Sequence, residues 1–223
     1  MNVTIKADQM GFSIAENISE KMIIQPSTFK VFPGDFIGIY GPSGSGKTTL
    51  LHLMSLMISP NHGRLSIYSE EGYLINQSDR DLWYREQVGF IFQHHSLFST
   101  LNVFENIAIS LRLKGMPKDF LNDQVMSVLS KVGLADKAYS KVAYLSGGER
   151  QRVSFCRAFA KKPRIIFADE PTAHLDQQSS SQMIDLLQSL MDDSQIIMMT
   201  SHDHRIIEVF KNIWRLADGK LMK

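Results

Sequence analysis

The chain carries the stretch Gly41-Pro42-Ser43-Gly44-Ser45-Gly46-Lys47-Thr48-Thr49. It fits the pattern G-x-x-x-x-G-K-[ST], in which a glycine-rich loop wraps a chain of phosphates. A short apolar run at 36–40 precedes this loop, and a helical pattern that starts at Thr49 follows it. A strand, a loop and a helix N-terminus in this order direct backbone N–H groups and the helix dipole at an anion. The stretch therefore predicts a nucleoside-triphosphate site.

Each residue type in this phosphate loop has a chemical reason. The glycines accept positive φ and let the backbone approach the phosphates closely. Lys47 supplies a positive charge for the β- and γ-phosphates, and the Thr48 hydroxyl is a ligand for Mg²⁺. We assign the whole loop, residues 41–49, to nucleotide binding, with a nucleoside triphosphate and Mg²⁺ as the expected ligands.

Composition narrows the class of protein. A length of 223 residues suits one α/β domain, and a net charge of +1 gives no electrostatic reason to expect nucleic-acid binding. The lone Cys156 suits a reducing compartment. No apolar run approaches the length of a membrane span, and the N-terminus alternates like a strand rather than a signal peptide. We expect a cytoplasmic protein that reaches a membrane only through other subunits.

Apolar runs and turn residues outline the remaining elements. Strands are expected at 3–7, 22–24, 29–31, 36–40, 64–68, 88–92, 164–168 and 196–200, with a turn near Met10-Gly11 and a hairpin about Asp218-Gly219. Helices are expected from a cap at Ser78 or Asp79 to Arg85, over 103–111 and 120–132, from 145 to about 161, and over 183–190. The continuous apolar run before Asp169 is typical of a strand buried on both faces of a parallel sheet.

Polar residues stand at the ends of several predicted strands. Gln93, Asp169-Glu170 and His202 each follow an apolar run, as the phosphate loop does. Each alone has a structural explanation, because acid pairs often cap helices and single histidines are usually structural. Ligands of open α/β sheets bind at the carboxyl ends of the strands, which favours a shared site. We expect Asp169 to hold Mg²⁺ with Thr48, directly or through water.

The same reasoning assigns the reaction chemistry. Glu170 is expected to act as general base toward the attacking water, since phosphoryl transfer depends on positioning and charge neutralisation. Gln93 is expected to contact both the metal and that water. His202 is expected to donate a hydrogen bond to the γ-phosphate. The sequence thus predicts a hydrolytic site rather than a phosphate-binding turn.

Over nearly the whole chain these residues resemble the nucleotide-binding subunits of ABC (ATP-binding cassette) transporters. The family has a signature stretch of its own, and this chain resembles it at Leu145-Ser146-Gly147-Gly148-Glu149-Arg150-Gln151. Residues 164–170 resemble its Walker B strand with the catalytic glutamate, Gln93 its Q-loop, Leu175-Asp176 its D-loop and His202 its switch histidine. Phe12 fits its adenine-stacking aromatic, with ordinary core packing as the alternative. Ser146 and Glu149 also fit a helix capping box, which is compatible with a signature role.

The resemblance implies a fold and an assembly. The fold is an α/β P-loop NTPase (RecA-like) core with a mainly parallel sheet, an N-terminal antiparallel β part and an inserted helical subdomain. Residues 1–95 and 162–223 would form the nucleotide-binding core, and 96–161 the helical subdomain with the signature. Two subunits would face head to tail, so that Ser146, Gly147 and Gly148 contact ATP bound by the partner. The expected partners are a second copy or a similar ATPase, and integral membrane permease subunits.

The stretch from Phe92 to Asn106 points to a subfamily. It resembles ATPases that drive lipoprotein release and macrolide or peptide export. The alternative is a non-transport ATPase that regulates a membrane or cell-division complex. A DNA-repair or translation ATPase is disfavoured, because the chain has one cassette and no basic stripe. We expect the protein to lie on the inner face of the cell membrane through its partners.

Overall fold

The computed structural model describes residues 3–16, 19–69, 79–173, 175–203, 210 and 212–223. The strands are β1 (Val3–Glu16), β2 (Ser19–Val31), β3 (Phe36–Tyr40), β4 (His62–Ser69), β5 (Val88–Ile91), β6 (Ile165–Ala168), β7 (Ile196–Ser201), β8 (Asn212–Ala217) and β9 (Lys220–Met222). The helices are α1 (Lys47–Met54), α2 (Arg80–Gln87), α3 (Val103–Leu113), α4 (Lys118–Lys131), α5 (Gly147–Phe159) and α6 (Gln177–Leu190), with short 3₁₀ turns at Ala135–Lys137 and Val142–Tyr144. The expected α/β fold is confirmed. None of the described helices is long and apolar enough to cross a membrane.

A six-stranded sheet in the order β5-β6-β7-β3-β8-β9 forms the centre of the molecule. Strands β5, β6, β7, β3 and β8 run parallel, and only β9 is antiparallel to its neighbour. The four strands that precede Gln93, Asp169, His202 and the phosphate loop are therefore consecutive neighbours in the sheet. Because parallel strands end at the same edge, this order brings the predicted polar groups together.

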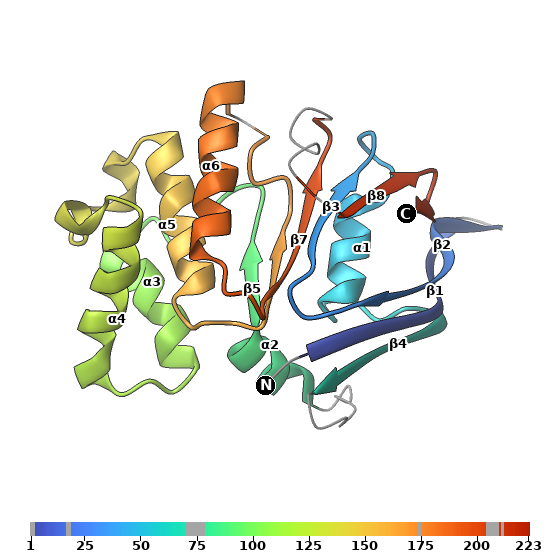
Figure 1. The fold of residues 1–223 in the computed structure, drawn as a ribbon, viewed down its shortest axis with the longest axis horizontal. Helices are drawn as coiled ribbons and strands as arrows, with labels where there is room; N and C mark the ends of the chain where they lie inside the picture. Colours follow the sequence, from blue (N-terminus) through green and yellow to red (C-terminus); the bar gives the residue numbers. More distant parts are fainter. Residues whose placement is uncertain (1–2, 17–18, 70–78, 174, 204–209, 211) are drawn as a thin grey trace.

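The parallel sheet is buried on both faces, as the continuous apolar run before Asp169 predicts. Along β6, Ile165 and Phe167 point into a core shared with α1 and the antiparallel sheet. Ile166 and Ala168, which alternate with them, point into a second core beside α5 and α6. In Figure 1, α1 and the antiparallel strands lie on one side of the sheet, and α5 and α6 on the other.

The N-terminal part is a three-stranded antiparallel sheet in the order β2-β1-β4. The turn expected near Met10-Gly11 is wrong, because β1 runs without a break from Val3 to Glu16. An irregularity replaces the turn: Gln9 has φ 50°, and the pairing with β2 shifts between Ala7 and Met10. A bulge of this kind accommodates the residues that suggest a turn, while the strand pairing continues on both sides of it.

The helical insertion has an apolar core of its own. Helices α3 and α4 and the first part of α5 contribute buried residues such as Ile107, Val125 and Val153 to one cluster. Helix α3 begins at a capping box in which Asn102 accepts from the Glu105 N–H and Glu105 accepts from the Asn102 N–H. Gly133 follows the end of α4 with φ 68°, as its predicted role as a stop requires.

One helix starts earlier than expected, and another starts at its expected position without a side-chain capping bond. Helix α6 begins at Gln177 rather than near Met183, because Asp176 caps it by accepting from the Ser179 N–H at 2.9 Å. Asp79 stands at the N-cap position of α2 without a side-chain capping bond, and Ser78 lies outside the described residues. The predicted C-terminal hairpin is confirmed, with Asp218 and Gly219 at φ 47° and 71°.

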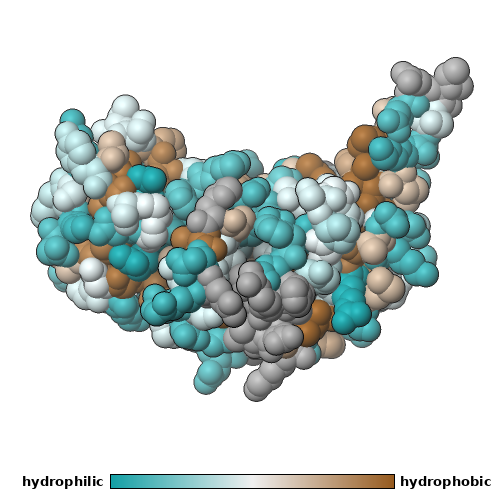
Figure 2. All heavy atoms as spheres, turned by 90° about the horizontal axis from the view of Figure 1, so that it is seen from above, coloured by the Kyte–Doolittle hydropathy of each residue, from teal (hydrophilic) through white to brown (hydrophobic). Residues whose placement is uncertain are grey.

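Seen from the carboxyl edge of the sheet, the end of the molecule formed by β1 and β2 projects from the body (Figure 2).

Candidate functional site

The phosphate loop connects β3 to α1 at the carboxyl edge of the sheet. Gly46 has φ 102°, and a Cβ there would lie 2.9 Å from the Ile23 carbonyl oxygen. At Gly41 a Cβ would lie 2.1 Å from the carbonyl oxygen of Leu216. Both positions therefore need glycine for steric reasons. Glycine at these positions lets the loop pass close to the neighbouring backbone on its way from β3 to α1.

Lys47 is buried beneath the loop, with 5% of its surface exposed. Its Nζ donates to the carbonyl oxygens of Gly41 at 2.9 Å and Pro42 at 3.0 Å. The same ammonium forms an ion pair with Glu170 Oε1 at 3.2 Å. The loop thus holds its only lysine pointing back across the strand ends, toward the acidic group expected to do the chemistry.

A pocket of about 270 Å³ opens at this edge. The residues that line it are Ile23, Ser43, Gly44, Gly46, Lys47, Thr48, Thr49, Gln93 and Glu170. Gln93 and Glu170 thus share one pocket with the loop, as the sequence predicts. Gly41 and Pro42 contribute through their carbonyl oxygens, which accept from Lys47 Nζ. Ser45 is buried next to Gly41.

Asp169 lies between two threonines that come from distant parts of the chain. Thr48 Oγ1 donates to Asp169 Oδ2 at 2.8 Å, and Thr200 Oγ1 donates to Asp169 Oδ1 at 2.7 Å. Asp169 is 7% exposed, so its carboxylate is held at both oxygens in a nearly buried position. Carboxylate, hydroxyl and amide oxygens from Asp169, Thr48 and Gln93 are the hard donors that Mg²⁺ prefers, so these residues fit the expected metal.

Glu170 is held in a conformation that few non-glycine residues adopt. Its φ is 43°, a left-handed value that costs about 1–3 kcal/mol and persists only where surroundings enforce it. Its N–H donates to Thr200 Oγ1 at 2.9 Å, and its Oε2 lies 2.8 Å from His202 Nδ1. With Lys47 on Oε1, the carboxylate is fixed at both oxygens. His202 and Glu170 are thereby brought together, as expected for one catalytic site.

The signature residues lie elsewhere. Ser146 and Gly147 are exposed at the N-terminus of α5, and none of the signature residues 146–149 is among the described residues that line the pocket. The predicted capping box is present, since Ser146 Oγ accepts from the Glu149 N–H and Glu149 Oε2 accepts from the Ser146 N–H. Lys137 also pairs with Glu149, and this bond, followed by the Ser146 N–H, lowers the pKa of the Glu149 carboxyl.

Phe12 and Asp176 lie outside the pocket as well. Phe12 is half-buried on β1 opposite Ile24, where it packs against the core beside the antiparallel sheet. Its neighbour strand supplies Ile23 to the pocket lining. Asp176 is exposed, and the N–H of Ser179 followed by its hydroxyl lowers the pKa of the Asp176 carboxyl. The structure therefore gives Asp176 a defined role as a helix cap.

Two residues of the site escape the sequence reasoning. Thr200 bonds to both Asp169 and the Glu170 N–H, although it sits inside an apolar run. Its signal is a polar residue at the carboxyl end of a buried strand, two positions before His202. Ile23 contributes to the pocket from a strand that precedes the loop, and no local pattern distinguishes it from a core isoleucine.

Comparison with known proteins identifies the fold and its family. The family model described as ABC transporter matches residues 24–173. The lipoprotein-releasing system ATP-binding protein LolD of Aquifex aeolicus is 34% identical over 93% of this chain and 95% of its own length. The macrolide export ATP-binding/permease protein MacB of Bdellovibrio bacteriovorus is 36% identical over 88% of this chain, which spans only 30% of that longer protein.

A solved structure agrees. The dimeric post-hydrolysis state of the ATP-binding cassette MJ0796, bound to ADP and Pi, has a TM-score of 0.86 and 26% identity, covering 98% of this chain and 97% of that one. The expected core with a helical insertion is thus the fold of an ATPase cassette. The chain therefore belongs to the ABC transporter family, among the ATP-binding subunits that resemble those of lipoprotein release and macrolide export.

Proposed function

We propose that two copies of this chain, or one copy and a similar ATPase, bind MgATP between them and hydrolyse it to drive movement in separate membrane permease subunits. The observation that carries this proposal is the position of the signature. Ser146 and Gly147 are exposed at the start of α5, outside the pocket that holds the phosphate loop. The dimeric MJ0796 cassette supports a second subunit as their target.

The phosphate loop would bind the triphosphate. Its N–H groups and the N-terminus of α1 attract the phosphates, and Lys47 turns from the carbonyl oxygens of Gly41 and Pro42 toward them. That movement breaks the Lys47–Glu170 ion pair and frees the Glu170 carboxylate. Nucleotide binding and release of the general base are in this way the same event.

Thr48, Asp169 and Gln93 would hold Mg²⁺. Their oxygens fit this ion, and Asp169 is already positioned by Thr48 and Thr200. When bound, Mg²⁺ neutralises charge that builds up on the β- and γ-phosphates. Thr200 keeps Asp169 in place by occupying the carboxylate oxygen that Thr48 does not contact.

Glu170 would accept a proton from the attacking water as its oxygen forms a bond to the γ-phosphorus. The bond from that phosphorus to the β–γ bridging oxygen breaks, and ADP and phosphate result. His202, bonded to Glu170 at Nδ1, keeps the carboxylate oriented, and its other ring nitrogen would face the γ-phosphate. Gln93 would complete the water's hydrogen bonds from the same pocket.

The signature of the partner would close the site. Ser146, Gly147, Gly148 and the start of α5 form an anion-binding helix end, on which Glu149 serves the capping box. Phe12 would stack on adenine, because it lies on β1 opposite Ile24, and the preceding residue, Ile23, lines the pocket. Asp176, exposed at the cap of α6, would contact the facing subunit. The helical subdomain, residues 96–161, would move against the core of 1–95 and 162–223.

A second hollow provides a surface for the permease. This docking cleft, of about 320 Å³, is mostly apolar and is lined by residues that include Met57, Tyr84, Phe92, Phe98, Leu113 and Arg157. Phe98 and Leu113 are 50% and 65% exposed, which is costly for large apolar side chains that lack a partner. A short apolar segment of a permease fits this cleft. The protein would then lie on the cytoplasmic face of the membrane, with a lipoprotein, peptide or drug as cargo.

Mixed dimers test the shared site. Lys47→Met disables a phosphate loop and Ser146→Arg a signature, and both are combined with Glu170→Gln so that ATP stays trapped. If the two changes lie in different subunits, both fall in one shared site and about one ATP per dimer remains trapped. If both lie in one subunit, each site carries one defect and no ATP is trapped. The opposite pattern would show that each subunit uses its own signature.

A further inference from the structure

The segment from Gln93 to Asn102 joins the ATP site to the helical insertion. Gln93 lines the pocket that holds the phosphate loop, and Asn102 caps α3. The path of the backbone between them decides where the Gln93 amide lies. Whatever fixes this segment therefore acts on the site from a distance.

The segment contains two consecutive left-handed residues. His95 and Ser96 have φ values of 46° and 47°. Residues with a Cβ rarely adopt this conformation, and neither of these positions is glycine. Two such residues in succession persist only if neighbouring groups enforce the turn.

Arg157 supplies that constraint from α5. Its Nη1 donates to the Ser96 carbonyl oxygen at 2.5 Å, and its Nη2 donates to the His95 carbonyl oxygen at 2.9 Å. One rigid guanidinium thus holds the carbonyls of both left-handed residues, in a fork geometry that lysine does not reproduce. Arg157 is half-buried, and desolvation lowers its pKa from a value so high that the group stays charged.

A second set of hydrogen bonds holds the segment farther along the chain. Asn106 of α3 is fully buried and accepts from the Phe98 N–H at 2.8 Å. Its amide donates to the carbonyl oxygens of Phe98 at 3.1 Å and Asn102 at 2.9 Å. The hydrogen bonds of both Arg157 and Asn106 come from the helical insertion. The segment therefore follows the insertion rather than the core when the two parts move.

We propose that Arg157 is a positioning residue for Gln93, which holds the His95-Ser96 turn and thereby sets the place of the Gln93 amide in the ATP site. This inference rests on the proposed role of Gln93. Arg157 also lines the docking cleft, so a permease segment seated there meets the guanidinium that fixes the turn. The residue thereby links an event in the cleft to the ATP site.

Arg157→Gln tests the positioning role in the purified chain. We expect kcat to fall about tenfold, and the Mg²⁺ concentration for half-maximal rate to rise, while ATP affinity changes little because the phosphate loop is intact. Arg157→Lys keeps the charge but loses the fork, so an intermediate loss is expected. A role in general folding would instead lower the amount of active enzyme without changing its Mg²⁺ dependence.

A glycine at position 96 separates positioning from packing. Glycine takes the left-handed conformation without penalty, so the turn needs Arg157 less. We expect Arg157→Gln to cost less than about threefold in kcat when Ser96→Gly is present, against about tenfold when it is absent. Equal losses in both backgrounds would overturn the proposal. If Arg157→Gln does not fold, the same comparison made with Arg157→Lys decides the question.

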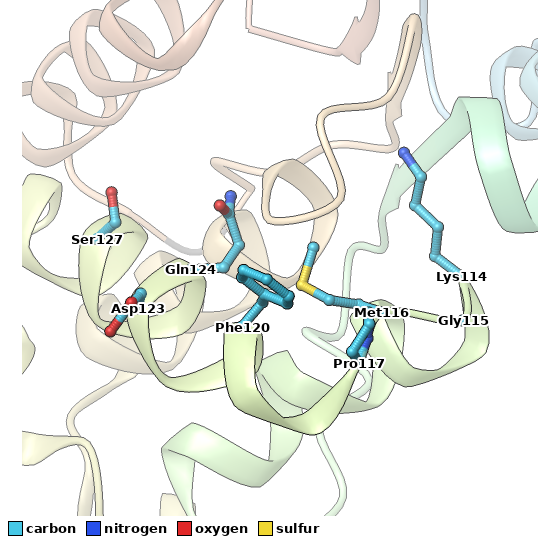
Figure 3. Close-up of a pocket in the computed structure, with 8 residues that line it drawn as sticks. All are labelled: Lys114, Gly115, Met116, Pro117, Phe120, Asp123, Gln124 and Ser127. Atoms are coloured by element: carbon cyan, nitrogen blue, oxygen red, sulfur yellow. The ribbon is translucent and has the colours of Figure 1, made fainter.

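Two further variants act as controls. Gln124 also donates from the helical insertion to a backbone carbonyl at the end of α5, that of Ala160 at 2.9 Å, and it lines a separate hollow beside Phe120 (Figure 3). No described hydrogen bond joins it to residues 93–102, so Gln124→Met should keep the normal kcat. Gln93→Ala should lose activity. If Gln93→Ala is fully active, the proposed role of Gln93 fails, whereas loss in Gln93→Ala with normal kinetics in Arg157→Gln refutes the role of Arg157 alone.

Discussion

Thr200 donates a hydrogen bond of 2.7 Å to Asp169 from the neighbouring strand. The same oxygen accepts from the Glu170 N–H at 2.9 Å, so one hydroxyl is bonded to both acidic residues of the site. Thr200 is fully buried, so its hydroxyl is shielded from bulk solvent. It fixes the carboxylate proposed to hold the metal and the backbone of the proposed general base.

Thr200→Val is the corresponding test. Valine keeps the shape of threonine but leaves Asp169 Oδ1 and the Glu170 N–H without the hydroxyl. We expect kcat to fall about 10–100-fold, as for other outer partners of metal ligands, with a higher Mg²⁺ requirement. Thr200→Ser keeps the hydroxyl and should retain most of the activity in a steady-state ATPase assay. Equal activity of the valine and serine variants would contradict the role of this bond.

The site was predictable where chemistry and strand ends coincide. The phosphate loop, Gln93, Asp169, Glu170 and His202 each carry a functional group at the end of an apolar run, and the sheet order brings them together. Thr200 was missed because a hydroxyl within a buried strand has many structural uses. The β1 turn was wrong because a bulge and a turn share the same local residues. Both errors concern long-range pairing, which no local pattern contains.

Lys161 makes stability depend on pH. Burial lowers the pKa of its amine to about 8, and the amine donates to the Tyr84 carbonyl oxygen at 2.7 Å. Below pH 8 this lysine is charged in both the folded and unfolded chain, so the burial cost is fully present. Between pH 8 and 10.5 only the unfolded chain keeps the proton. The free energy of unfolding therefore increases, and the folded chain becomes more stable, as pH rises.

Comparison with Lys161→Met isolates this effect from other titrations. The lost bond to Tyr84 gives an offset that does not depend on pH. We expect the difference in unfolding free energy to change by about 2 kcal/mol in favour of the wild-type chain between about pH 8 and pH 10, measured by urea denaturation. A difference that stays constant over this range would show that the amine titrates normally.

If a permease binds in the docking cleft, a charge introduced at the edge of the cleft should weaken that binding. Leu113 is 65% exposed at its edge, and Leu113→Glu should reduce co-purification of an integral membrane permease about tenfold, because a carboxylate would be buried in the interface. Phe120 is 63% exposed in the other hollow, so Phe120→Glu is the matched control and should retain the partner. The ATPase rate of the isolated chain should not change in either variant.

The identity of the captured proteins separates the functional alternatives. An export permease supports the proposed role, and a periplasmic binding protein among the partners would indicate import instead. Equal capture by the Leu113→Glu and Phe120→Glu variants would place the permease interface outside the docking cleft.

Glu170→Gln isolates the chemical step from nucleotide binding. Glutamine has the same shape but cannot take a proton from water, and it loses the ion pair that Lys47 makes with Glu170. Lys47 is then free for the phosphates, so ATP should bind at least as tightly as in the wild type. The trapped nucleotide should also hold two chains together, as a dimer visible by light scattering.

Single-turnover hydrolysis of bound ATP by Glu170→Gln is the decisive measurement. We predict that the variant binds ATP, forms a stable dimer and hydrolyses ATP at least about a hundredfold more slowly than the wild type, which is the contribution expected of a general base. A variant that turns over ATP at the wild-type rate would remove Glu170 from the reaction and contradict the proposed mechanism.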